Sequence, residues 1–252
     1  MSATAATRAV LSADGTALTE LRDVFVQDPP SPNAMHFGSR VVPHGGVLYV
    51  TTGEHFSTRE RQFAQDVDKT YGKVIRISPE GGATAGNPFG NEVWSLGHRN
   101  VQGAAIRPDD GSLWTLEHGP AGGDELNKIT GGANYGWPLV SYGVNYSGAV
   151  VGSGKAQAKG MTAPRYYWDP VIAPGGFAFY DGDKFPAWRG DILAASLNPG
   201  GLVRLVLEGD NVIGEERFLN GEMRVRDVEI DREGRVLILD NTDGRLLRLT
   251  QK

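Results

Sequence analysis

Short apolar segments recur along the whole chain, and turn-forming residues bound each of them. The segments are rich in β-branched residues and are separated by Gly, Pro, Asp and Asn, which is the pattern of β-strands joined by tight turns. None of them continues into the period of a long amphipathic helix. The predicted strands are residues 47–52, 73–77, 112–115, 192–196, 202–207, 225–230, 236–239 and 246–249. The sequence therefore predicts an all-β protein.

Two local patterns alternate along the chain and indicate a repeated architecture. One is an apolar residue, a turn with glycine and then an apolar strand, and the other is an apolar strand that contains an arginine. They begin at Val42, Ile106 and Ile230 and at Lys73, Leu202 and Leu246, respectively. This alternation favours a β-propeller of four-stranded blades over a β-sandwich. We expect one propeller domain over residues 1–252, with a surface loop inserted at residues 142–164.

Composition narrows the classes of function. The chain has 35 Gly and 14 Pro, which serve as turn residues here, and its net charge of −5 without a basic stripe argues against a nucleic-acid partner. The absence of cysteine excludes disulfides, thiolate catalysis and Cys-based zinc sites. No apolar run approaches the roughly 20 residues that span a bilayer, so membrane insertion is not expected. The first ten residues lack the apolar core of a secretory signal peptide.

Polar and charged residues gather in one stretch, residues 94–138, in and around a predicted hairpin. Arg99, which precedes Asn100, could reach an anionic oxygen or could pair with a carboxylate at the edge of a blade. Farther along, the backbone carbonyls of Gly119 and Pro120 and the side chains of Asp124, Glu125 and Tyr135 are hard oxygen donors. Calcium prefers such donors, although their spacing is not that of an EF-hand loop. A hydrogen-bonded turn explains the same residues, and both interpretations stay open.

His36 precedes a predicted strand, where a neutral imidazole could act as a general base. A lone histidine is also a common structural residue, and no spacing of the zinc-binding type accompanies it. Arg224 and Arg226 are two residues apart and would share one face of a strand. Like charges at this distance indicate a polyanionic ligand, unless Glu222 or Asp227 neutralises one of them.

Several long motifs together resemble the soluble aldose sugar dehydrogenases of the glucose/sorbosone dehydrogenase family, which depend on pyrroloquinoline quinone (PQQ). The motifs are HFGSR, YGKVIRI, WSLGHRNVQG, LWTLEHGPAGGDELN, GANYGWP, WRGDIL and RVRDVEI. The resemblance covers nearly the whole chain. It implies a six-bladed propeller that holds PQQ and Ca²⁺, and an exported, periplasmic protein.

The resemblance also implies roles for individual residues in the oxidation of an aldose at its anomeric carbon. His36 resembles the base that takes the proton of the anomeric hydroxyl, and Arg99 resembles the residue that polarises the quinone oxygen. Gly119 and Pro120 resemble the carbonyl ligands of the catalytic Ca²⁺. The implied cofactor-binding residues are Arg99, Asn100, Asn198, Arg224 and Arg226. Glu125 and Tyr135 resemble ligands of a second, structural Ca²⁺.

The chain departs from the family pattern at several positions. Asn198 stands where members carry a cofactor-binding lysine, and Val171 replaces a small hydroxyl residue near the cofactor. Glu54, His55 and Phe56 replace a more usual Gly-Asp-x-Gly. The family's N-terminal region before the matching segment is also missing, so we expect an N-terminally truncated propeller with about four blades.

Three functions follow as hypotheses. The first is a PQQ- and Ca²⁺-dependent dehydrogenase that converts aldoses to lactones and passes electrons to an unknown acceptor. The second is a catalytically silent propeller that keeps the scaffold and the calcium site. The third is a Ca²⁺-dependent hydrolase resembling lactonases, and the arginine pair argues against it because a neutral lactone offers no anion.

Overall fold

The structure is a computed structural model that describes residues 1–250, and it is all-β apart from two short 3₁₀ turns. The chain divides into two compact units, which we describe separately. Unit 1 comprises Met1–Val101, Thr130–Pro138 and Lys159–Thr162, and unit 2 comprises Gln102–Ile129, Leu139–Ala158 and Ala163–Lys252. No helix among residues 1–250 is long and apolar enough to cross a lipid bilayer.

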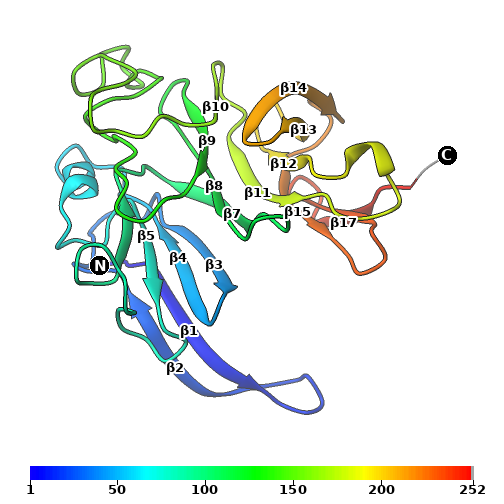
Figure 1. The fold of residues 1–252 in the computed structure, drawn as a ribbon, viewed down its shortest axis with the longest axis horizontal. Helices are drawn as coiled ribbons and strands as arrows, with labels where there is room; N and C mark the ends of the chain where they lie inside the picture. Colours follow the sequence, from blue (N-terminus) through cyan, green and yellow to red (C-terminus); the bar gives the residue numbers. More distant parts are fainter. Residues whose placement is uncertain (251–252) are drawn as a thin grey trace. The chain divides into compact units, whose positions relative to one another are not determined.

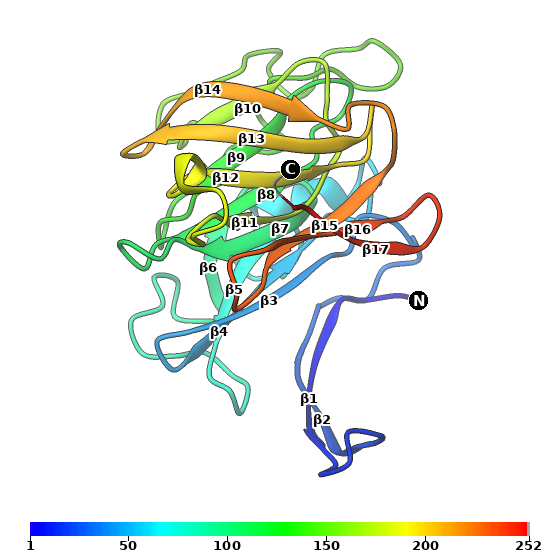
Figure 2. The ribbon, with the colours of Figure 1, turned by 90° about the vertical axis from the view of Figure 1, so that its right-hand side faces the viewer.

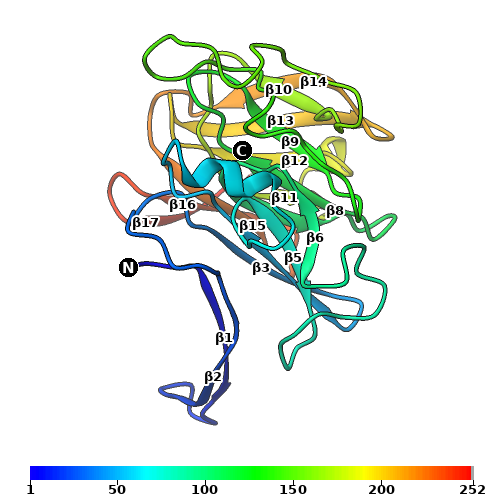
Figure 3. The same cartoon turned by 90° about the vertical axis from the view of Figure 1, so that its left-hand side faces the viewer.

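Unit 1 contains a two-stranded hairpin and a four-stranded antiparallel sheet (Figure 1). The hairpin pairs β1 (Ala5–Leu11) with β2 (Leu18–Val26). The sheet follows the chain in the order β3 (Gly38–His44), β4 (Val47–Thr52), β5 (Lys73–Ile77) and β6 (Val93–Leu96). The 3₁₀ turn η1 (Glu60–Gln65) connects β4 to β5 and is the cyan coil in Figure 3. Apolar side chains from both parts form one core: Ala6, Val24, Phe25, Val50, Ile75, Ile77 and Val93.

Unit 2 contains two four-stranded antiparallel sheets and one three-stranded sheet (Figure 2). The first sheet has β7 (Val101–Ile106), β8 (Leu113–Glu117), β9 (Asp124–Lys128) and β10 (Tyr166–Trp168). The second has β11 (Pro174–Phe179), β12 (Ile192–Ser196), β13 (Gly201–Glu208) and β14 (Asn211–Phe218), with the 3₁₀ turn η2 (Pro186–Trp188) between β11 and β12. The third has β15 (Val225–Ile230), β16 (Val236–Asp240) and β17 (Arg245–Arg248).

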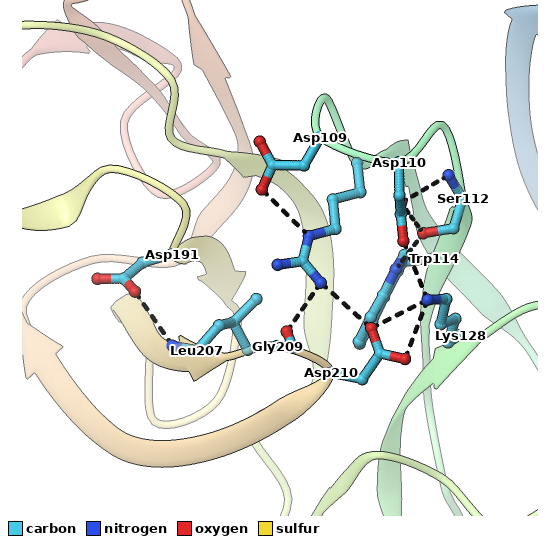
Figure 4. A network of polar contacts seen from close by, with 10 residues as sticks. Asp109, Asp110, Ser112, Trp114, Lys128, Asp191, Leu207, Gly209 and Asp210 are labelled. Atoms are coloured by element: carbon cyan, nitrogen blue, oxygen red, sulfur yellow. Dashed lines mark hydrogen bonds and ion pairs between the residues drawn. The ribbon is translucent and has the colours of Figure 1, made fainter.

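An ion-pair network joins the first two sheets of unit 2 (Figure 4). Lys128 of β9 donates to both carboxylate oxygens of Asp210, at 2.9 and 3.0 Å, and to Asp110 at 3.1 Å. Arg107 donates to the carbonyl of Gly209 at 2.8 Å. Two cations therefore hold the β13–β14 turn against the β7–β8 turn, and the apolar cores of the sheets lie behind them.

The all-β prediction is confirmed, and four of the predicted strands have the observed bounds: β4, β5, β12 and β15. The prediction was wrong at Asp124 and Glu125, which it placed in a turn and which begin β9. It also missed β9 and β14, whose sequences are largely polar or exposed. These strands are set by pairing with a neighbouring strand, which a single segment does not display. The propeller and its single domain stay predictions.

A fully buried lysine holds the 3₁₀ turn of unit 1 in place. The Nζ atom of Lys73 donates to the carbonyls of Phe63 at 2.7 Å, Ala64 at 2.9 Å and Tyr71 at 2.6 Å. Three acceptors match the three N–H groups of an ammonium, whereas removal from water opposes its charge. Burial is the larger effect and lowers the pKa of Lys73 to about 7.

This shift makes the contribution of Lys73 to stability dependent on pH. Between pH 7 and 10 the unfolded chain binds the Lys73 proton more tightly than the folded protein, so the free energy of unfolding rises with pH. We expect the stability difference between the wild type and Lys73→Met to widen in favour of the wild type across this range. Urea unfolding of both proteins at pH 7 and 9.5 measures it. A constant difference would show that the hydrogen bonds to the three carbonyls affect the pKa of Lys73 more than burial does.

Candidate functional site

The residues singled out in the sequence lie at turns of alternating strands. In an antiparallel sheet, the start of one strand and the end of the next lie at the same end of the sheet, which we call an edge here. His36 precedes β3, Glu54 follows β4, and Arg99 follows β6. All three therefore lie at one edge of the unit 1 sheet. We call His36, Glu54, Arg99 and Asn100 the His36 edge.

Hydrogen bonds join the members of the His36 edge directly. The Nδ1 atom of His36 lies 2.7 Å from Oε1 of Glu54, whose side chain is 1% exposed. The backbone N–H of Glu54 donates to the carbonyl of Arg99 at 3.1 Å, and Oδ1 of Asn100 accepts from the N–H of Gly38 at 3.1 Å. The predicted base and the predicted cation thus share one hydrogen-bonded framework. Glu54 is the residue that sequence reasoning missed as a partner of His36, although a carboxylate just after a strand was a usable signal.

Arg99 is a buried cation at this edge. Its residue is 4% exposed, and its guanidinium carbon lies 5.2 Å from the centre of the Trp137 ring. Arg61 approaches the same indole at 5.9 Å. An arginine held over an aromatic face keeps its charge and its orientation. The structure thus fixes a positive charge in the unit that carries His36.

Gly53 permits the close approach between the two strands that carry these residues. A Cβ atom at Gly53 would lie 1.7 Å from the carbonyl oxygen of His36 and 3.0 Å from Oδ1 of Asn100. Any side chain would therefore push the His36 loop away from β4. The distance between His36 and Glu54 depends on this glycine.

The carboxylate of Asp124 organises a corresponding edge in unit 2. Its Oδ1 atom accepts from the N–H of Gly119 at 2.8 Å, and its Oδ2 atom accepts from the N–H groups of Ile172 at 2.9 Å and Ala173 at 2.7 Å. Asp124 is 1% exposed. The carboxylate therefore accepts hydrogen bonds from three backbone N–H groups, and these bonds stabilise the loop that carries Gly119 and Pro120.

The same edge continues to the predicted cofactor-binding residues. The N–H of Asn198 donates to the carbonyl of Ile172 at 3.1 Å, and Nη1 of Arg224 donates to the carbonyl of Leu197 at 3.1 Å. The structure therefore brings Gly119, Asn198 and Arg224 to one end of the unit 2 sheets, and we call this the Asp124 edge.

Arg224 and Arg226 lie at the start of β15. β15 begins at Val225, with an irregular register between Val225 and Asp227, so Arg224 directly precedes the strand and Arg226 lies within it. Within residues 1–250, neither arginine forms an ion pair with an acidic side chain, and Oδ1 of Asp227 accepts from the N–H of Val228. Two cations without acidic partners suit an anionic ligand.

Two acidic side chains face each other across β8 and β9. Glu117 pairs with Glu125, and Nδ2 of Asn127 donates to both of them, at 3.0 and 3.2 Å. Burial and then the neighbouring Glu117 raise the pKa of Glu125 well above its ordinary value. Oδ1 of Asn127 and Oγ1 of Thr115 are buried without a hydrogen-bond partner. The cluster consists of hard oxygen donors, and sequence reasoning had found only Glu125.

Other predicted residues have structural contacts. Tyr135, which belongs to unit 1, stacks on His98 with ring centres 4.6 Å apart, and its hydroxyl accepts from the N–H of Thr130. Nε2 of His98 contacts Oγ of Ser95 at 2.9 Å. Nε2 of His118 contacts the carbonyl of Pro174 at 2.7 Å. These rings are held by packing and by local hydrogen bonds.

The sequence and the fold agree with one protein family. The glucose/sorbosone dehydrogenase family matches residues 1–248, and the chain belongs to this family. It is 38% identical to the aldose sugar dehydrogenase YliI of Escherichia coli, over 96% of this chain and 67% of that protein. The chain spans between 52% and 67% of the length of the curated relatives it matches.

Solved structures of dehydrogenases are similar to this fold. The apo-form of the soluble aldose sugar dehydrogenase of Escherichia coli is similar with a TM-score of 0.92 and 38% identity, over 97% of this chain and 72% of that one. The PQQ-bound form of the aldose sugar dehydrogenase of Streptomyces coelicolor is similar with a TM-score of 0.76 and 31% identity, over 95% of this chain and 66% of that one.

The close contact at Gly53 gives a direct test of the His36 edge. We expect Gly53→Ala to lower the free energy of unfolding by about 1–3 kcal/mol, because the new methyl group must displace the His36 carbonyl. Gly214→Ala is the matched control, since a Cβ there meets only the Val206 side chain at 3.5 Å. Urea unfolding measures both. Equal stabilities of the two variants would contradict the packing described here.

Proposed function

We propose that the protein is a PQQ- and calcium-dependent dehydrogenase that oxidises aldose sugars at the anomeric carbon to lactones. The observation that carries the proposal is the buried Glu54 carboxylate 2.7 Å from Nδ1 of His36, in a framework shared with Arg99. A histidine held in this way is an oriented general base. Membership of the dehydrogenase family and the similarity to a PQQ-bound structure agree with it.

The His36–Glu54 pair determines which ring nitrogen takes the substrate proton. Glu54 is an acceptor, so we assign the His36 proton to Nδ1, and Nε2 keeps its lone pair. Nε2 would then take the proton of the anomeric hydroxyl. The carboxylate of Glu54 stabilises the imidazolium that forms.

The residues present fit PQQ, which carries several carboxylates and would accept the hydride when bound. Arg224 and Arg226, which have no acidic partners among residues 1–250, would hold its carboxylates, with Asn198 beside them. Asn198 replaces a charged lysine contact, and we expect weaker binding of the cofactor for that reason. Arg99, with Asn100, would stabilise negative charge on a quinone oxygen.

The residues also fit Ca²⁺. In unit 2, the backbone carbonyls of Gly119 and Pro120 would hold the catalytic ion, and Glu125 beside Glu117 would hold a second ion. Within residues 1–250, no three acidic or histidine side chains gather, so carbonyl or amide oxygens must complete either site. The assignment of Tyr135 as a ligand rests on the family resemblance alone.

Reconstitution tests the proposal. We expect the purified chain with PQQ and Ca²⁺ to reduce a dye when aldoses are added. His36→Ala should lower kcat by about 100-fold or more, because a general base is lost. His44→Ala is the matched control, since this histidine is exposed on β3, and it should keep full activity. Absence of PQQ binding by the folded wild type would favour the catalytically silent alternative.

The proposed second calcium site can be tested by thermal unfolding, without measuring enzyme activity. We expect Ca²⁺ at about 100 times its Kd to stabilise the protein by roughly 2.7 kcal/mol per site, which raises Tm. Glu125→Gln should lose part of this rise, and Mg²⁺ should not replace Ca²⁺ because it keeps its water ligands. Thermal unfolding in Ca²⁺, Mg²⁺ and chelator measures the effect. An undiminished rise in Glu125→Gln would contradict the role of Glu125.

A further inference from the structure

A second histidine is buried directly behind the His36–Glu54 pair. His55 follows Glu54 in the chain and is 0% exposed. Its Nε2 atom lies 2.7 Å from Oε1 of Gln27, and its Nδ1 atom lies 3.1 Å from the carbonyl oxygen of Asn33. The ring also packs against Tyr71 and Phe37, with ring centres 5.1 and 5.2 Å away. Polar and aromatic contacts therefore surround the imidazole.

The polar partners of His55 are themselves fixed. Nε2 of Gln27 donates to the carbonyl of Gly53 at 2.9 Å, so Oε1 of Gln27 is the atom that faces His55. Nδ2 of Asn33 donates to the buried carboxylate of Glu60 at 2.6 Å. Burial is the largest influence on the pKa of His55 and lowers it. Both ring nitrogens face an oxygen atom, and the contact to Gln27 is the shorter of the two.

The backbone at His55 is in a conformation that needs such support. His55 and Phe56 have φ angles of 60° and 65°, in the left-handed region, and His36 has a φ of 50°. Non-glycine residues rarely adopt this region, because the Cβ atom lies too close to the following carbonyl oxygen. Surrounding contacts must offset this cost if the conformation is to persist. The available contacts are the ring of His55, the ring of Phe56 at 4.9 Å from that of His36, and the bond from the N–H of His55 to the carbonyl of His36.

These observations connect the His55 ring to the position of Glu54. The two consecutive left-handed residues come directly after Glu54, so they fix the direction in which the chain leaves it. Without the contacts of the His55 ring with Gln27 and Asn33, the turn would relax toward ordinary φ values. The carboxylate of Glu54 would then no longer be aimed at His36.

We propose that His55 is a positioning residue for the general base. Its buried ring, held between Gln27 and Asn33, maintains the left-handed turn that keeps the Glu54 carboxylate on Nδ1 of His36. This inference rests on the proposed function, in which His36 takes the substrate proton. His55 itself acts only through Glu54.

The test follows the titration of the His36 imidazole by NMR in the protein without cofactor. Glu54→Gln sets the scale, because it replaces the carboxylate beside Nδ1 of His36 with a neutral amide of similar size. We expect His55→Phe, which keeps an aromatic ring but has no polar atoms, to shift the midpoint the same way by at least half as much. His55→Gln, which keeps one donor for Gln27, should shift it less. His44→Phe is the control for an exposed histidine.

The direction of the shift distinguishes a positioning role of His55 from a direct effect of its charge. If His55 influenced His36 only as a nearby positive charge, its removal would shift the midpoint opposite to the loss of the Glu54 carboxylate. A shift opposite to that of Glu54→Gln, or no shift, in a folded variant overturns the proposal, and His55→Gln decides the question if His55→Phe does not fold. In the reconstituted protein we expect kcat to fall about tenfold in His55→Phe with little change in KM, and the acid limb of the pH profile to move with the midpoint.

Failure of the proposed function has its own signature. If Glu54→Gln leaves the His36 midpoint unchanged, the pair itself does not exist in solution, and both inferences fall. If the midpoints shift as expected but no sugar oxidation occurs, the positioning role of His55 stands while the dehydrogenase activity fails.

Discussion

Antiparallel strands alternate in direction, so the residues before one strand and after the next are brought to one edge of the sheet. This constraint places His36, Glu54 and Arg99 together in unit 1 although they are far apart in the chain. It places Gly119, Asn198 and Arg224 at one end of the unit 2 sheets in the same way. The strands supply a rigid, buried framework, and the turns at one edge carry the polar groups.

Turns at a crowded edge leave backbone groups buried, and buried polar side chains satisfy them here. Asp124 accepts three N–H groups, Lys73 donates to three carbonyls, and Gln27 donates to the carbonyl of Gly53 while it accepts from His55. Each such residue would be costly to bury alone, and each is stabilised by the backbone groups around it. These buried polar residues therefore stabilise the turns that carry the candidate site residues.

The His36 edge combines close packing with unusual backbone conformations. Gly53 admits the carbonyl of His36 at a distance that no side chain would allow, and three non-glycine residues nearby have positive φ angles. Such features persist when surrounding contacts fix them, and they are concentrated at functional sites. The buried carboxylate of Glu54 is the product of this arrangement. In the proposed function, it gives His36 the tautomer that proton transfer requires.

The sequence alone determined the all-β class and several strand bounds, because short β-branched segments between turn residues have a local signature. Its long motifs also identified the family, and the roles of His36 and Arg99 stay predictions from that resemblance. Only the tertiary structure revealed three contacts. Glu54 is the partner of His36, Asp124 accepts hydrogen bonds from backbone N–H groups, and Glu117 pairs with Glu125. These relations join residues from different strands, and their geometry depends on register and on turns. The two-residue spacing of Arg224 and Arg226 likewise could not reveal the irregular register at the start of β15, because register depends on the neighbouring strand β16.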